Sequence, residues 1–297
     1  MKIPAYAKIN WFLQVMGRRP DGYHNLHMLM QRIQLHDTLY LTSAEQLSLQ
    51  MSVKPSAETS FDIPCDENNI VLRSARLLQQ ECNCTLGAQI VLEKRIPSQA
   101  GLGGGSADAA ATLQGLNQLW NLRLTPKQLA LLGLRLGADV PYCLNSKPAL
   151  VGGMGEDIQV VDIDEQYAML LIQPEVGIST AALFSTLSGL KKRDQAIPAA
   201  SVDATLRALQ TRDYALLRTS STNDLQAAAE AMVPQVSQIQ RDLYAHGAAF
   251  AQMTGAGSVV FGVFITQADA ERAAASLSEH YQSVILTNTL PDTKAVP

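Results

Sequence analysis

The most informative stretch of the sequence is a glycine-rich run that follows Ile96. We define the glycine loop as residues 97–106, and four of the five residues from Gly101 to Gly105 are glycine. Glycine is costly in backbone entropy, so such a run needs a geometric reason. A backbone that must approach a large anion and turn several N–H groups toward it supplies that reason. The run therefore indicates a phosphate-binding loop.

The residues after the glycine loop strengthen this interpretation. Residues 107–120 have a strongly helical pattern, so the loop leads directly into a helix. The first N–H groups of a helix lack partners within it and carry the positive end of its dipole, and both properties favour phosphate. The alternative is a tight strand-to-helix connection without a ligand, but one or two glycines would be enough for that.

The two most common phosphate loops differ from the glycine loop in detail. A Walker loop requires Gly-Lys-Ser/Thr after four intervening residues, and no lysine follows these glycines. The Rossmann fingerprint requires a third glycine at the position of Ser106, counting from Gly101. A nucleotide-dependent oxidoreductase is therefore disfavoured.

An N-terminal strand is predicted to position two polar side chains. Residues 8–15 alternate, with Ile9 and Trp11 on one face and Lys8 and Asn10 on the other. This pattern predicts a half-buried strand. Lys8 and Asn10 are therefore expected to point in the same direction.

The rest of the pattern predicts mixed helices and strands. Strands are expected within residues 28–53, 88–94, 168–173, 250–254, 259–265 and 283–287, and helices within residues 69–80, 107–120, 126–136, 201–221, 225–246 and 267–280. The third of these helices is the best delimited, with Thr125 as N-cap, Pro126 at its first position and Gly137 beyond its end. Because the pattern restarts after about residue 155, we expect two domains, residues 1–155 and 156–297.

Composition narrows the classes of function. Of the 297 residues, 47% are hydrophobic and 17% are charged, which excludes a disordered chain. The formal net charge of −4 argues against nucleic acid as a partner. No apolar run approaches the roughly 20 residues that span a bilayer, and the N-terminus lacks a secretory pattern. Four cysteines without metal-site spacing are typical of reduced thiols, so we expect a cytoplasmic protein with no membrane partner.

Five segments carry a resemblance to a known family, and they occur in order at residues 4–10, 18–24, 97–106, 136–141 and 254–258. The glycine loop resembles the phosphate-binding motif of the GHMP kinases, which include galactokinase, homoserine kinase and mevalonate kinase. Lys-Ile-Asn at residues 8–10 and Asp-Gly-Tyr-His at residues 21–24 resemble one branch of this family. The substrate of that branch is 4-diphosphocytidyl-2-C-methyl-D-erythritol. Residues 42–66 and 185–200 carry no recognisable signature.

The resemblance implies an α+β fold in two parts. The N-terminal domain, residues 1–155, is expected to adopt a ribosomal protein S5 domain 2-like fold and to bind ATP. The C-terminal domain, residues 156–297, is expected to be a ferredoxin-like sandwich, with ATP and the acceptor meeting in the cleft between the domains. The resemblance also implies ATP as phosphoryl donor and Mg²⁺ as its companion ion, with no metal ligand assigned. A monomer or weak dimer is expected.

By the same resemblance, Asp139 and Lys8 match a catalytic aspartate and lysine. Phosphoryl transfer runs through a loose transition state, so positioning and charge stabilisation supply most of the catalysis. A carboxylate can orient the attacking hydroxyl and accept its proton. A nearby ammonium keeps that carboxylate ionised and offsets charge on the moving group. The alternatives are that Asp139 only caps a turn and that Lys8 is exposed on an edge strand.

The resemblance also assigns ligand-binding residues. For ATP these are Pro97, Ser98, Gln99, Ala100, Gly101, Leu102, Gly103, Gly104, Gly105, Ser106, Ala107, Asn68 and Lys94. For the cytidine-diphosphate substrate they are Asn10, Tyr23, His24, Phe184, Thr254 and Gly255. Tyr23 and His24 are expected to hold the cytosine by stacking and hydrogen bonding, with Phe184 on its other side. Turn packing of Tyr23, a core role for Phe184 and a plain glycine hairpin at residues 254–258 are the alternatives.

Two other functions stay open at this point. A GHMP kinase for mevalonate or homoserine is disfavoured by the Asp-Gly-Tyr-His segment, because those substrates contain no base to stack. A binding protein that keeps the loop as an ATP sensor is disfavoured by the presence of both Lys8 and Asp139. The resemblance thus favours an ATP-dependent kinase that phosphorylates the 2-hydroxyl of 4-diphosphocytidyl-2-C-methyl-D-erythritol, in the non-mevalonate isoprenoid pathway.

Overall fold

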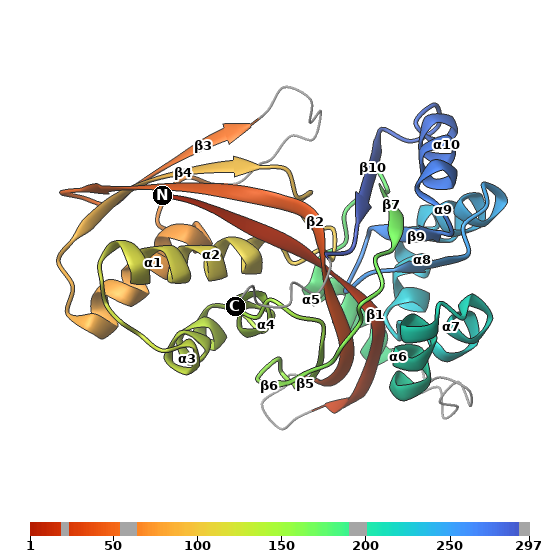
Figure 1. Cartoon of the computed structure of the whole chain (residues 1–297), viewed down its shortest axis with the longest axis horizontal. Helices are drawn as coiled ribbons and strands as arrows, with labels where there is room; N and C mark the ends of the chain where they lie inside the picture. Colours follow the sequence, from red (N-terminus) through yellow and green to blue (C-terminus); the bar gives the residue numbers. More distant parts are fainter. Residues whose placement is uncertain (19–23, 54–63, 190–200, 291–297) are drawn as a thin grey trace.

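The computed structural model describes residues 1–18, 24–53, 64–189 and 201–290, which form two β-sheets with helices packed on them (Figure 1). The strands of the first sheet are β1 (Lys2–Arg18), β2 (His24–Ala44), β3 (Ser48–Val53), β4 (Gly87–Lys94), β5 (Ala149–Gly153) and β6 (Asp157–Val160). The helices beside it are α1 (Ile70–Cys82), α2 (Gly104–Leu119), α3 (Pro126–Leu136) and α4 (Val140–Leu144). In Figure 1, α1, α2 and α3 lie along one face of this sheet.

Strand β2 organises the first sheet. It is 21 residues long, and β1 pairs with it antiparallel along one edge. Its other edge is shared, because β5 pairs with residues 26–30 and β4 pairs with residues 38–44. The β3–β4 pair is parallel and the other pairs in this sheet are antiparallel. This arrangement places β1 and the end of β4, from which the glycine loop leaves, in one sheet.

The second sheet has the strand order β10-β7-β9-β8, with antiparallel neighbours. Its strands are β7 (Ala168–Gln173), β8 (Phe250–Met253), β9 (Val260–Phe264) and β10 (Ser283–Asn288). Its helices are α5 (Thr180–Gly189), α6 (Val202–Thr211), α7 (Tyr214–Ser220), α8 (Gln226–Met232), α9 (Gln235–Ala245) and α10 (Gln267–Leu277). The order strand, helices, two strands, helix, strand is the ferredoxin-like arrangement. The predicted α+β fold class is confirmed.

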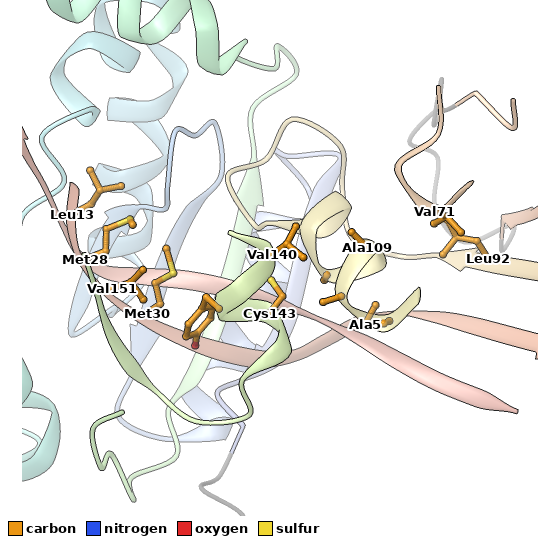
Figure 2. Close-up of a cluster of buried hydrophobic side chains, with 14 of the residues drawn as sticks. Ala5, Leu13, Met28, Met30, Val71, Leu92, Ala109, Val140, Cys143 and Val151 are labelled. Atoms are coloured by element: carbon orange, nitrogen blue, oxygen red, sulfur yellow. The ribbon is translucent and has the colours of Figure 1, made fainter. Parts of the chain in front are cut away.

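The hydrophobic core continues from one sheet to the other. Figure 2 shows the part in which Met28 and Met30 of β2 and Val151 of β5 lie near Val140 and Cys143 of α4. A second cluster joins residues of β1 to residues of the second sheet, and it contains Ala7, Ile9, Trp11, Phe12, Tyr167, Met169, Phe250 and Phe261. Strand β1 therefore belongs to the core of both halves.

The prediction of a half-buried strand near the N-terminus was wrong in one respect. The side chains of Lys8 and Asn10 are buried, although both were placed on the face opposite Ile9 and Trp11. Helix α2 and residues of the second sheet both pack against β1, and residues 7–13 of the strand are buried on both faces. A register shift between Asn10 and Phe12 also breaks the alternation, which brings Trp11 and Phe12 into the same core cluster.

Two of the predicted long helices are each divided in two. The helix expected over residues 201–221 ends at Arg212, whose φ is +52°, and Asp213 caps the helix that follows. The helix expected over residues 225–246 is interrupted at Pro234, because proline has no N–H to continue the hydrogen-bond ladder. Within the described residues, no helix is long and apolar enough to cross a membrane.

Candidate active site

The glycine loop connects β4 to α2 and lies against two other segments of the chain. Gly101 and Gly103 have φ values of +73° and +69°, in the left-handed region that favours glycine. A Cβ at Gly101 would overlap the carbonyl oxygen of Thr254. A Cβ at Gly103 would lie 3.0 Å from the Cγ and Cε atoms of Lys8. Both positions therefore need glycine for their φ and for the close approach of their neighbours.

The first turn of α2 presents its N–H groups at the end of the glycine loop. The N-cap of this 16-residue helix is Gly103, which has no side chain to accept hydrogen bonds from these groups. Gly105 is exposed, and a Cβ there would have Ile70, 3.9 Å away, as its nearest neighbour. Free N–H groups at the positive end of a helix are suited to bind phosphate.

Lys8 and Asp139 meet beside this turn. The Lys8 ammonium lies 3.3 Å from Oδ2 of Asp139 and donates a 2.8 Å hydrogen bond to Oδ1 of Asn10. The second contact confirms that Lys8 and Asn10 point in the same direction. The Lys8 side chain is 4% exposed and that of Asp139 is 28% exposed, so the carboxylate is the part of the pair that solvent reaches.

The alternative explanations for these two residues do not describe their environment. Lys8 is buried rather than exposed, and its backbone N–H donates to the carbonyl of Leu102 in the glycine loop. Asp139 is the N-cap residue of α4, but its carboxylate makes no capping hydrogen bond within the described chain. Burial, with the Asp139 carboxylate nearby, raises the pKa of the neighbouring Cys143 thiol to about 12, so this thiol stays uncharged beside the pair.

The turn after β8 brings the second sheet to the same site. The N–H of Asn10 donates to Oγ1 of Thr254 at 3.0 Å, and Thr254 is fully buried. A Cβ at Gly255 would lie 3.1 Å from the Lys8 ammonium nitrogen and 2.6 Å from the Gly101 carbonyl oxygen. Thr254 and Gly255 were predicted to bind the substrate, and the structure places both in contact with residues of the site.

Asn223 holds this turn in place and was missed by the sequence analysis. Its side-chain amide donates to the carbonyls of Met253 at 2.8 Å and of Gly255 at 2.9 Å. Its Oδ1 accepts from the N–H of Leu225. The sequence signal was an asparagine two residues before a helix, which indicates a local cap and gives no hint of a contact 32 residues away.

His24 and Phe184, which were predicted to bind the base, contact each other. Their rings stack, with centroids 5.0 Å apart and planes inclined by 19°. His24 begins β2 and Phe184 lies in α5, so the stack joins the two halves of the chain. Tyr23 lies outside the described residues. The predicted role of these rings in holding a base stays a prediction.

The two residues predicted near the adenosine differ in their surroundings. Asn68 lies just before α1, and its N–H donates to Oδ1 of Asp66 at 2.9 Å. Because Ile70 of α1 is near Gly105, this segment borders the glycine loop. Lys94 is buried, and its ammonium donates to Asp37 and Asp108. Neither carboxylate was identified from the sequence.

Comparison with known proteins identifies the family. The model for the GHMP kinases N terminal domain matches residues 69–147, and the model for the GHMP kinases C terminal domain matches residues 205–283. The 4-diphosphocytidyl-2-C-methyl-D-erythritol kinase of Moorella thermoacetica is 40% identical over 98% of this chain and 99% of that protein. The chain belongs to the GHMP kinases. The resemblance inferred from its five segments is thus confirmed.

Other similar proteins support the assignment of this chain to the GHMP kinases. The protein of the same name from Alkaliphilus metalliredigens is 35% identical over 97% of this chain and 96% of that protein. A crystal structure of 4-(cytidine 5'-diphospho)-2C-methyl-D-erythritol kinase matches with a TM-score of 0.81 and 30% identity, covering 97% of this chain and 99% of that one. Homoserine kinase from Cytophaga hutchinsonii shares the fold, with a TM-score of 0.69 and 17% identity over 98% of this chain and 95% of that chain.

Proposed function

We propose that this GHMP kinase transfers the γ-phosphoryl group of ATP to the 2-hydroxyl of 4-diphosphocytidyl-2-C-methyl-D-erythritol. Relatives that carry the name of this activity match nearly the whole chain at 33–40% identity. The observation that carries the chemistry is the contact of 3.3 Å between the Lys8 ammonium and the Asp139 carboxylate beside the glycine loop. A carboxylate that orients the acceptor hydroxyl, an ammonium and a phosphate-binding helix end are the parts that phosphoryl transfer needs.

The geometry supports a different role for each of these groups. The N–H groups at the start of α2 bind the phosphates, while the partly exposed Asp139 orients the acceptor hydroxyl and takes its proton. An ammonium has three donors, and in Lys8 one bonds Asn10 and a second faces Asp139. The third is left for an oxygen of the transferred phosphoryl group, where it offsets developing charge.

Asn10 supplies a further donor to the acceptor. Its Nδ2 atom is buried and has no hydrogen-bond partner in the part of the chain that the structure describes. A buried amide N–H without a partner is costly, so a native structure provides one for it in some functional state. Because Oδ1 of the same amide is held by Lys8, Nδ2 is fixed in direction and suited to bind a substrate oxygen.

We place Mg²⁺ on the triphosphate rather than in a cage of protein ligands. Among the described residues, no group of three His, Cys, Asp or Glu side chains could hold a metal ion. Magnesium in kinases commonly takes its ligands from phosphates, water and one or two side chains. The hydroxyl of Ser106, which lies 3.7 Å from the position of a Cβ on Gly137, is a side chain of the loop that fits this role. Bound there, Mg²⁺ would offset charge on the phosphates.

Three further expectations accompany the proposal. The two domains are expected to divide close to residue 155, near the change from the first sheet, which ends at Val160, to the second, which begins at Ala168. The protein is expected to act as a monomer or weak dimer. Its four cysteines are free thiols, which fits the reducing cytoplasm.

A coupled ADP-release assay tests the proposal directly. We expect MgATP to yield substrate-dependent ADP with 4-diphosphocytidyl-2-C-methyl-D-erythritol, and none with mevalonate or homoserine in parallel reactions. Phosphorus NMR of the product should show a new phosphomonoester on the erythritol. Release with mevalonate or homoserine alone would keep the kinase and refute the proposed acceptor. Folded protein that binds ATP and releases no ADP with any acceptor would refute catalysis.

A further inference from the structure

Three ionisable side chains are buried together beneath the glycine loop. They are Asp37 of β2, Lys94 of β4 and Asp108 of α2, and their side chains are at most 4% exposed. The Lys94 ammonium donates to Oδ2 of Asp37 and, at 2.8 Å, to Oδ2 of Asp108. One ammonium thus joins two acidic side chains from different elements.

Asp37 fixes the backbone at the start of the loop. Its Oδ1 accepts hydrogen bonds from the N–H of Arg95 at 2.5 Å and from the N–H of Ile96 at 2.8 Å. These two residues leave β4 and lead into the glycine loop. A single carboxylate therefore sets the direction in which the chain enters the loop, and its other oxygen is bound to Lys94.

Lys94 and Asp108 fix the other end of the loop. Asp108 lies in the second turn of α2, the helix whose first N–H groups face the phosphate site. The Lys94 ammonium nitrogen lies 3.6 Å from the position that a Cβ on Gly104 would occupy, directly beside the first residue of this helix. The entry to the loop and the helix that follows it are thus joined through one lysine.

Stability alone does not explain three ionisable residues buried in this place. Buried ion pairs contribute little compared with apolar side chains of the same volume, because desolvation offsets most of their attraction. Their contacts are directional, however, and charge-assisted hydrogen bonds fix geometry more strictly than apolar packing. The arrangement therefore points to a role in holding a shape.

We infer that Asp37, Lys94 and Asp108 are positioning residues that hold the glycine loop in its phosphate-binding shape. The inference rests on the proposed function of that loop. It assigns Lys94 to the support of the loop, whereas the sequence analysis expected it to bind ATP directly. The N–H groups at the start of α2 can bind a triphosphate only if the loop keeps its angle to the helix, and these three residues fix that angle from both ends.

Three variants test separately the contact of Asp37 with the start of the glycine loop and the contact of Lys94 with α2. Asp108→Ala removes the link to α2 but leaves a balanced buried pair of Lys94 and Asp37, so the protein is expected to fold. Its KM for ATP is expected to rise about tenfold, as the loss of one charge-assisted hydrogen bond predicts. Asp108→Asn keeps an oxygen that accepts from Lys94 and should restore a KM close to that of wild type. Asp37→Asn is expected to raise KM about 100-fold, because it replaces one of two oxygens that both accept hydrogen bonds by an NH2 donor.

The decisive result is a change in ATP binding without a matching change in kcat or in the KM for the acceptor. For Asp108→Ala, kcat and the KM for the acceptor are expected to change less than threefold, while the affinity for a non-hydrolysable ATP analogue falls in calorimetry. Glu81→Gln, which breaks an exposed contact with Arg135, serves as the control and should bind ATP as wild type does. Lower thermal stability with wild-type affinity for the analogue in Asp108→Ala would overturn the inference. Calorimetry measures binding of the analogue without turnover. A failure of the proposed kinase reaction can therefore be distinguished from a failure of this inference.

Discussion

Replacing Lys8 by methionine removes an almost fully buried ammonium beside Asp139 and tests the mechanism most directly. The ammonium donates to Asn10 at 2.8 Å and lies 3.3 Å from the Asp139 carboxylate. Methionine keeps an apolar chain under Gly103, where the stem of the lysine packs. The fold is therefore expected to persist while the charge is lost.

The variant should show two effects of different size. Loss of one donor aimed at charge that develops in a transition state lowers kcat by about 100- to 1000-fold, or about 3–4 kcal/mol. Leaving Oδ1 of Asn10 without its donor costs about 1–3 kcal/mol of unfolding free energy. Asp139 is 28% exposed, so water can solvate its carboxylate after the ammonium is gone. The KM for ATP should change only a few-fold, because the N–H groups of α2 are untouched.

Steady-state kinetics with the coupled ADP assay measures both constants, and circular dichroism checks the fold. Lys147→Met is the control, because Lys147 is 38% exposed and lies 4.0 Å from Asp162 at the surface. A surface pair of this kind contributes little, so the control should keep the kcat of wild type. A folded Lys8→Met enzyme with a kcat within tenfold of wild type would refute the role of the ammonium in the transition state.

Other substitutions test other parts of the site. Asp139→Ala should lose most turnover but bind ATP normally in calorimetry; near-wild-type turnover would remove it from the mechanism. Thr254→Val removes the acceptor for the N–H of Asn10 and should lower the unfolding free energy by about 1–3 kcal/mol in urea titrations. Burial raises the pKa of Asp108 from 3.8 to about 8 on folding, so its protonated form stabilises the native state at low pH. That stability is lost as pH rises toward 8, and urea titrations from pH 5 to 8 should show a shallower decline in Asp108→Asn.

The parts of the site that are local in sequence could be predicted from it. Four glycines before a helical pattern predicted the loop and the start of α2, and the alternation of residues 8–10 placed Lys8 and Asn10 on one face. These inferences hold because backbone φ and strand periodicity depend on near neighbours. The same alternation failed at Phe12, where a register shift against β2 is a property of the pairing and not of one strand.

Contacts across long sequence separations could not be predicted in the same way. The hydrogen bond from Asn10 to Thr254 joins residues 244 positions apart, and the bond from Lys94 to Asp37 joins residues 57 apart. Nothing in the residue types around Asp37 or Asn223 distinguishes them from ordinary polar residues of a strand end or a helix start. Their roles depend on which elements the fold brings together, which a local pattern does not encode.

The glycine loop is shaped by the second half of the chain as well as by the first. Asn223 holds the carbonyls of Met253 and Gly255, and the turn between them contacts both Gly101 and Lys8. A displaced turn would therefore move the ammonium and the loop together, although every proposed catalytic side chain belongs to the first half. It follows that the second half helps to set the distance between the Lys8 ammonium, which is proposed to stabilise charge, and the first N–H groups of α2, which are proposed to hold the phosphates.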